Sequence, residues 1–245
     1  MPLNTIITAN EILNRVAAEV GIQPTEDPYA STDPKFVQLT YLLNTAGEEL
    51  TWAHPWEFLI KEHQFLTVLG DSGDYPLPSD FIYLLNQTGW DHTSAIPIGG
   101  PLTPQDWTYL KGRNLAQNTL YASFRIADGV FKVYPNPPPS GLDLNYEYIS
   151  KNWVIDSVDP LNRVDSVRFG ADKPLFDRTI ITRYLKLKYL EASGFDTTKA
   201  QDDFNQAFSF QIGKDKGAPI VNAGTQIRNY PYLSVANFSD TGFGT

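Results

Sequence analysis

The stretch TWAHPWEFLIKEHQFL, residues 51–66, marks the point at which the chain changes from one kind of structure to another. Before it, apolar residues recur at the spacing of a helix, and His54-Pro55 predicts the helix end, because proline disfavours helical growth. From Trp56 onward the pattern is alternating and aromatic, which is typical of β-strands. A helical part therefore precedes a strand-rich part.

Two helices are predicted upstream of this change. Asn10 is the predicted N-cap of the first helix, and Gly21 is its predicted stop. The second helix is expected to begin at Asp33-Pro34, because aspartate caps helices and proline fits the first turn. Gly47 lies on its apolar stripe, where a missing side chain costs about 1 kcal/mol of helix propensity. We expect another backbone to approach closely there.

Strands are predicted downstream, in FLIKEHQFLTVL (58–69), in FRIA and VFKVYP on either side of Asp128-Gly129, and in LDLNYEYISKNWVI (142–155). The Asp-Gly pair predicts a hairpin, because a type I′ turn needs two residues with positive φ. A short helix, PQDWTYLKG, is expected at 104–112.

Helical spacing returns after Pro174 and ends at Gly194, and a last helix is predicted to begin near Asp196 or Thr197. This order predicts an α+β fold, in which a mostly antiparallel β domain is inserted into a helical bundle. The expected parts are the bundle halves 1–55 and 174–213, the β domain 56–173 and an extended C-terminal arm 214–245.

The composition limits what the chain can do. Its 245 residues carry 19 Lys and Arg against 28 Asp and Glu, a net charge of −9, which argues against a surface that grips nucleic acid. Cysteine is absent, which excludes disulfides, thiolate metal sites and cysteine nucleophiles. No apolar run approaches the roughly 20 residues of a membrane span, and no signal peptide is visible. We expect a soluble chain that is not exported by a signal peptide and does not enter a membrane.

No motif for a cofactor or a catalytic centre stands out. The glycine patterns of phosphate-binding loops are absent, and the histidines match no helical pair of zinc ligands. Asp71, Asp74 and Asp80 could hold Ca²⁺ through oxygen ligands, but the EF-hand pattern is missing. We therefore expect no metal, no cofactor and no enzymatic activity.

Two functions can be considered from the residue types alone. Aromatic side chains in an acidic, strand-rich chain fit a carbohydrate-binding module of a virion or secreted protein, although large aromatics mostly fill cores and interfaces. The tryptophans in question are Trp52, Trp56, Trp90, Trp107 and Trp153. A hydrolase with paired carboxylates is the other alternative, since DSG at 71–73 and DTG at 240–242 resemble the loops of aspartic proteases.

Six segments follow one another between residues 75 and 154: YPLPSDF (75–81), GWD (89–91), TPQDW (103–107), FRI (124–126), VYPNPP (133–138) and YEYISKNWV (146–154). Their order, within a helix–β–helix frame, resembles the head-to-tail adaptor proteins of short-tailed double-stranded DNA phages, the group that includes tail tubular protein A. The similarity continues through Ala171-Asp172 and the helix near Asp177, and it covers residues 1 to about 213.

The resemblance implies a structural virion protein without catalytic residues. It implies a homo-oligomeric ring, usually of twelve copies, which docks beneath the portal protein at the head–tail interface after assembly in the host cytoplasm. The helices would lie side by side around the ring, and the β domain would face other tail or nozzle proteins. DNA would pass through the channel without specific binding, and an acidic chain suits this passage because carboxylates repel phosphates.

Two sets of residues are candidates for partner contacts. Arg178 and Arg183 lie on a basic helix that also carries Lys186 and Lys188, and this face could meet an acidic neighbour. The segment after residue 213 has no helical period and few charges, and we expect it to gain order on a partner. Its candidate contact residues are the aromatics Tyr230, Tyr232, Phe238 and Phe243.

Overall fold

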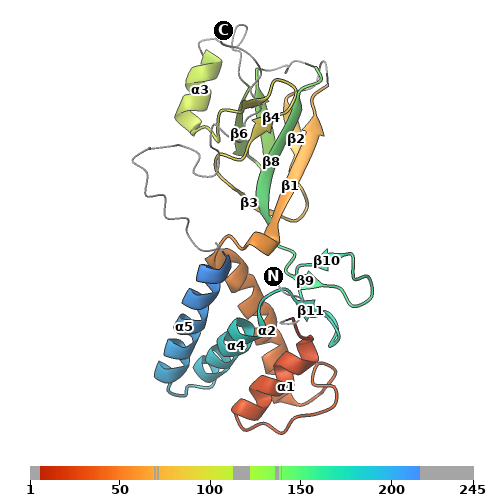
Figure 1. The fold of residues 1–245 in the computed structure, drawn as a ribbon, viewed down its shortest axis with the longest axis vertical. Helices are drawn as coiled ribbons and strands as arrows, with labels where there is room; N and C mark the ends of the chain where they lie inside the picture. The colour runs from red at the N-terminus through yellow and green to blue at the C-terminus, as the bar shows by residue number, and fades with distance from the viewer. Residues whose placement is uncertain are drawn as a thin grey trace, which may run out of the picture.

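The computed structural model describes residues 6–215, except 69, 71, 113–121, 136, 137 and 139. It has two halves along its longest axis, a strand-rich half that includes α3 and a helical half (Figure 1). The expected α+β fold is confirmed, because antiparallel sheets are inserted between two N-terminal helices and a C-terminal helix pair that packs with them. In the described part of the chain, no helix is both long and apolar enough to span a membrane.

Helix α4 lies at the centre of the helical half and contacts the other three helices. The helices are α1 (Ala9–Glu19), α2 (Pro34–Ala53), α4 (Arg178–Ala192) and α5 (Thr198–Asp215). The predicted start of α2 is confirmed, since the carboxylate of Asp33 accepts a hydrogen bond from the Lys35 N–H at 2.9 Å. Gly21 and Gly194 follow α1 and α4 with φ of 76° and 73°, the left-handed conformation of helix ends.

The predicted N-cap of α1 is wrong. Thr8 caps the helix, and Asn10 lies inside its first turn. The side chain of Asn10 instead donates to Asp27 at 3.0 Å and accepts from the Tyr29 N–H at 3.2 Å. The helix begins early because its first N–H donates to the carbonyl oxygen of Asp172, a residue far along the sequence, at 2.8 Å.

Strand β8 is the centre of the larger sheet in the strand-rich half. It pairs along its length with β1, and its other edge pairs with β3 and β4, which continues to β5. These strands are β1 (Ile60–Leu66), β3 (Phe81–Leu84), β4 (Trp90–Asp91), β5 (Ile96–Pro97) and β8 (Asp143–Ser150). A single 3₁₀ turn, Glu57–Leu59, leads from the helical half into β1.

A second antiparallel sheet has the order β2-β7-β6, with β2 (Asp74–Pro76), β6 (Ser123–Ala127) and β7 (Val130–Tyr134). The predicted hairpin joins β6 to β7, and Asp128 and Gly129 have φ of 57° and 70°, as a type I′ turn requires. The two sheets share a core in which Phe131 stacks on Phe124 at 4.6 Å and on Tyr146 at 4.8 Å. Helix α3 (Pro104–Gly112) has the predicted bounds.

A third, small sheet packs against the helices. It has the order β10-β9-β11, with β9 (Val154–Ile155), β10 (Arg163–Val164) and β11 (Lys173–Pro174). Trp153, Val154 and Val164 belong to the same buried cluster as the apolar residues of α1, α2 and α4. Residues beyond the larger sheet therefore contribute to the core of the helical half.

Gly47 lets Trp153 approach α2. A Cβ atom at residue 47 would lie 2.2 Å from two ring carbons of Trp153, which is far inside van der Waals contact. The sequence predicted a close approach at Gly47, but the approaching group is an indole ring and not a backbone. The ring is buried, with 1% of its surface exposed, and it lies near Phe176.

Gly47→Ala is expected to lower the free energy of unfolding by about 1–3 kcal/mol, because the Trp153 ring must leave its position. This loss should occur although alanine improves helix propensity by about 1 kcal/mol. Urea unfolding followed by tryptophan fluorescence measures it.

Gly213→Ala is the matched control. Gly213 also lies in a helix, α5, but a Cβ there would meet nothing within 4 Å. We expect this variant to be unchanged or slightly more stable. Equal losses at both positions would contradict the proposed role of the Trp153 contact.

Candidate interaction surfaces

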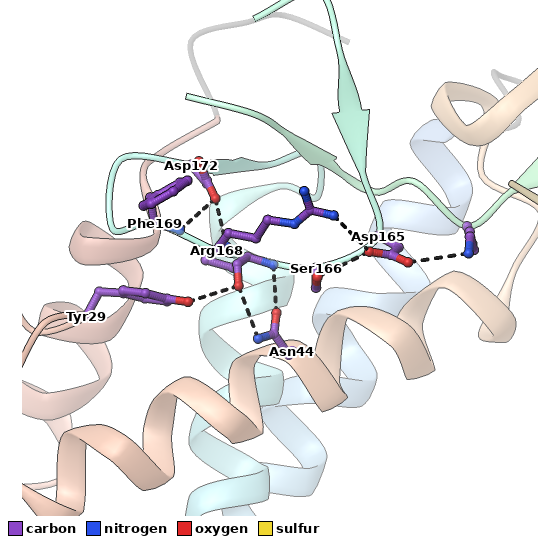
Figure 2. Close-up of polar contacts among 9 residues, drawn as sticks. Tyr29, Asn44, Asp165, Ser166, Arg168, Phe169 and Asp172 are labelled. Atoms are coloured by element: carbon purple, nitrogen blue, oxygen red, sulfur yellow. Dashed lines mark hydrogen bonds and ion pairs between the residues drawn. The ribbon is translucent and has the colours of Figure 1, made fainter. Parts of the chain in front are cut away.

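The loop at residues 165–172 is held across α2 by hydrogen bonds (Figure 2). The side chain of Asn44 on α2 accepts from the Val167 N–H at 2.8 Å and donates to the Val167 carbonyl at 3.4 Å. The hydroxyl of Tyr29 donates to the same carbonyl at 3.1 Å. Val167 is thus held in place by two side chains of the helical half.

Asp172 holds the other end of this loop (Figure 2). One carboxylate oxygen accepts from the N–H groups of Arg168 and Phe169, each at 2.8 Å, and the other accepts from the Ser157 N–H at 2.9 Å. Burial alone would raise the pKa of Asp172, but hydrogen bonds from Ser157, Arg168 and Phe169 outweigh it and lower the pKa. The side chain is therefore an ionised structural acceptor at neutral pH.

A first candidate surface is the outward side of α2, called here the α2 outer face and made of Val37, Tyr41, Thr45, Glu48 and Trp52. The five residues follow helical spacing and are all exposed. Tyr41 and Trp52 are 73% and 65% exposed, which is unusual for rings of this size. Large exposed aromatics on the same side of one helix are typical of a contact surface.

A hollow of about 310 Å³ adjoins the α2 outer face. Trp52 and Glu48 form its helical side, and Ile82 of β3 and Asp165 of the loop lie around it. Trp153 also lines the hollow, and its buried indole N–H has no hydrogen-bond acceptor among the described residues. A buried donor without an acceptor costs about 1–3 kcal/mol.

A second candidate surface is the groove between α1, α4 and α5, called here the cationic groove. It has a volume of about 380 Å³. Its charged lining residues are Arg15, Glu19, Arg178, Arg183, Lys186 and Asp203. Four basic groups against two acidic ones make this groove positive within a chain of net charge −9.

The structure brings Arg178 and Arg183 together in this groove, with Lys186 beside them. Lys188, on the same basic helix, does not line the groove and pairs instead with Glu49 of α2 at 2.7 Å. Sequence reasoning missed Arg15, because its place beside α4 results from the packing of α1 on α4. Helical periodicity could group residues within α4 but gave no signal for this pairing. The other candidate contact residues lie outside the described part of the chain; they are Tyr230, Tyr232, Phe238 and Phe243.

The tryptophans mostly serve packing. Trp56, Trp107 and Trp153 are buried, and only Trp52 and Trp90 of the five expose a third or more of their surface. An exposed row of rings, as a sugar-binding platform would need, is therefore not formed by the tryptophans as a set.

Asp80, one of the three suggested Ca²⁺ ligands, has internal partners. Its carboxylate accepts from Lys61 at 2.6 Å, Ser150 at 2.6 Å and Tyr148 at 2.9 Å. Burial alone would raise the pKa of Asp80, but these hydrogen bonds and the Lys61 charge lower it. Asp71 lies outside the described residues, and among those that are described no group of three acidic or histidine side chains is arranged to hold a metal ion.

The fold and its surfaces define a protein whose prominent exposed features suit contacts with other macromolecules, namely an aromatic helix face and a charged groove. A family model described as SU10 adaptor protein matches residues 7–225. Because this match covers most of the chain, the protein belongs to the SU10 adaptor protein family. No match was found among curated proteins.

Membership of this family establishes a structural adaptor protein of the phage virion and confirms the resemblance recognised in the sequence. It also confirms that the role is structural and not enzymatic, and it implies contacts with portal or tail proteins.

Asp172→Asn is expected to lower the free energy of unfolding by about 1–3 kcal/mol at neutral pH. Both carboxylate oxygens accept from N–H groups, so an amide NH₂ would face a donor at one of them. Since the pKa of Asp172 is lowered by folding, its stabilising effect is complete above the pKa of the unfolded chain and is lost as the pH falls through the folded value. The difference from wild type should therefore shrink in acid, as measured by urea unfolding across pH.

The matched control is Asp177→Asn at the N-cap of α4. One carboxylate oxygen of Asp177 accepts a backbone hydrogen bond there, from the Thr179 N–H at 2.8 Å, and asparagine caps helices equally well. A loss at Asp177 as large as that at Asp172 would show that the charge alone, and not the pair of acceptor oxygens, matters.

Proposed function

We propose that this protein forms a closed ring between the portal protein and the tail of a phage, through which DNA passes without specific binding. The family match over residues 7–225 carries this proposal. A ring of about twelve copies fits the resemblance to short-tailed phage adaptors, and the site of action is the head–tail interface of the virion. The proposed parts are a helical bundle at 1–55 and 174–213, an inserted β domain at 56–173 and a C-terminal arm at 214–245.

Neighbouring copies meet through the α2 outer face. A closed ring needs heterologous contacts, in which one face of a copy packs against a different face of the next. Tyr41 and Trp52 supply large apolar area there, and aromatics of this kind dominate binding energy in interfaces.

The outer side of the β1–β8 ladder is a candidate for the surface that faces DNA. Glu62 and Glu147 are direct cross-strand neighbours, so two carboxylates lie side by side. Burial, and then the charges of Glu62 and Glu57, raise the pKa of Glu147. Like charges in this arrangement destabilise the sheet but would repel phosphates and let DNA slide past.

The C-terminal arm, with Tyr230, Tyr232, Phe238 and Phe243, contacts the portal protein or an adjacent ring. Aromatic segments of low charge bind by ordering on a partner, either in a groove or as an added strand. Arg178 and Arg183 belong to a separate contact, which is described below.

The experiment that tests the proposed function is a measurement of mass and shape. Light scattering after size exclusion, with negative-stain images, is carried out on the full chain with and without portal assemblies from the same phage. Rings, formed alone or on the portal, are the expected result. A compact monomer that ignores the portal would overturn the proposal.

Trp52→Glu and Tyr41→Glu are each expected to raise the protein concentration needed for ring formation at least about tenfold. The monomer should stay folded, because both side chains are exposed. Light scattering against concentration measures assembly, and circular dichroism checks the fold. Leu161→Glu is the matched control, since Leu161 is 98% exposed and lies in the loop between β9 and β10, outside α2. Rings that form normally with both α2 variants would contradict the proposed lateral contact.

Removal of residues 216–245 is expected to weaken docking on the portal without loss of the fold. The cut is placed after Asp215 because its carboxylate accepts from the Glu57 N–H at 3.1 Å and lies 3.3 Å from the His54 ring. Co-sedimentation with portal assemblies measures docking, and the melting temperature should stay within a few degrees of wild type. Undiminished docking would remove the arm from the mechanism.

A further inference from the structure

The cationic groove has more positive charge than its own acidic groups can neutralise. The carboxylate of Glu19 pairs with Lys186 at 2.9 Å, and that of Asp203 pairs with Lys199 at 2.8 Å. Each acidic side chain of the groove therefore already has a lysine as its partner.

Three arginines of the groove lack such a partner. Arg183 donates to the backbone carbonyl of Asp203 at 2.8 Å, which is a neutral acceptor. Arg15 and Arg178 are exposed, and among the described residues no carboxylate lies within ion-pair distance of either. Guanidinium groups are planar forks of donors that match a carboxylate in a two-pronged hydrogen bond. The groove thus holds two guanidinium groups, those of Arg15 and Arg178, without a carboxylate partner, and a third, that of Arg183, whose acceptor is a neutral carbonyl.

The positive charges in and beside the groove also act on Asp203, one of its own acidic residues. The hydrogen bond from Lys199, followed by the charges of Lys199, Arg183 and Lys186, lowers the pKa of Asp203. Arg178 and Thr179 form the first turn of α4, whose N-terminus adds a partial positive charge, although Asp177 caps this end. An anionic group in the groove would meet the same field.

We infer that the cationic groove binds a carboxylate-bearing segment of a partner protein other than this chain, with Arg15, Arg178 and Arg183 contacting its acidic side chains. This inference deepens the proposed function, on which it rests, by naming the chemistry of one partner contact.

Duplex DNA fits the groove less well than an acidic peptide. DNA presents one charge per roughly 1.7 Å and needs an extended strip of cations, whereas this groove has room for a few side chains and holds two carboxylates. A second copy is also disfavoured, because the α2 outer face, with its exposed Tyr41 and Trp52, suits contact between copies better. An acidic segment of a different protein is the occupant that remains.

The test uses the full chain and a hexaglutamate peptide with blocked ends, titrated by calorimetry at low ionic strength. Binding is expected to weaken at least about fivefold in Arg15→Ala and in Arg178→Ala, and to weaken further with added salt. Arg125→Ala, on β6 in the other half of the molecule, is the matched control and should bind the peptide as wild type does. Hexaglutamine and a short DNA duplex are the comparison ligands.

Three results would overturn the inference: peptide binding that the groove variants leave unchanged, tighter binding of the duplex than of hexaglutamate, or groove variants that alter ring formation and not peptide binding. The two proposals can fail separately. Rings that form while hexaglutamate does not bind would remove only the groove, and peptide binding by a chain that never forms rings would remove only the ring.

Discussion

The contact of the Trp153 ring with Gly47 is the constraint that joins the two halves of this protein. Trp153 directly follows the larger sheet, yet its ring is buried against α2, where a methyl group would already collide with it. Trp56, at the other crossing of the chain, is also fully buried, and both indoles lie near Phe176. The position of the strand-rich half is therefore set by the core of the helical half. At each of the two crossings, a tryptophan of the connecting segment is itself part of that core.

Local chemistry in the sequence predicted most of the framework. Asp33-Pro34, Gly194 and Asp128-Gly129 each act through their own backbone or a neighbouring N–H, so their effects could be inferred without knowing the fold. Thr8 could not be preferred over Asn10 as a cap, because the choice depends on the distant Asp172 carbonyl. The strands of the small sheet have only two residues each, which is too short for any alternation to appear. Their packing on the helices is a purely tertiary effect.

The candidate surfaces were predictable to a smaller extent. Arg178 and Arg183 were found because charges on one helix can be grouped by periodicity. Arg15 joins them from a helix that is more than 160 positions earlier, and no pattern in either segment indicates that pairing. The apolar stripe of α2 predicted which side is buried, but the aromatics on its opposite side become informative only when their exposure is known. Surfaces depend on what the rest of the chain fails to cover, whereas turns such as Asp128-Gly129 depend on a few adjacent residues.

Within the described residues the chain passes between its halves twice, at 54–60 and at 150–154, and the passages lie side by side because Ile60 pairs with Ile149. A single connection would let one half swivel about the long axis. Two adjacent connections, each next to a buried indole, are expected to restrict this rotation. In the proposed ring, this restriction would keep the helical and strand-rich halves of every copy at the same relative angle.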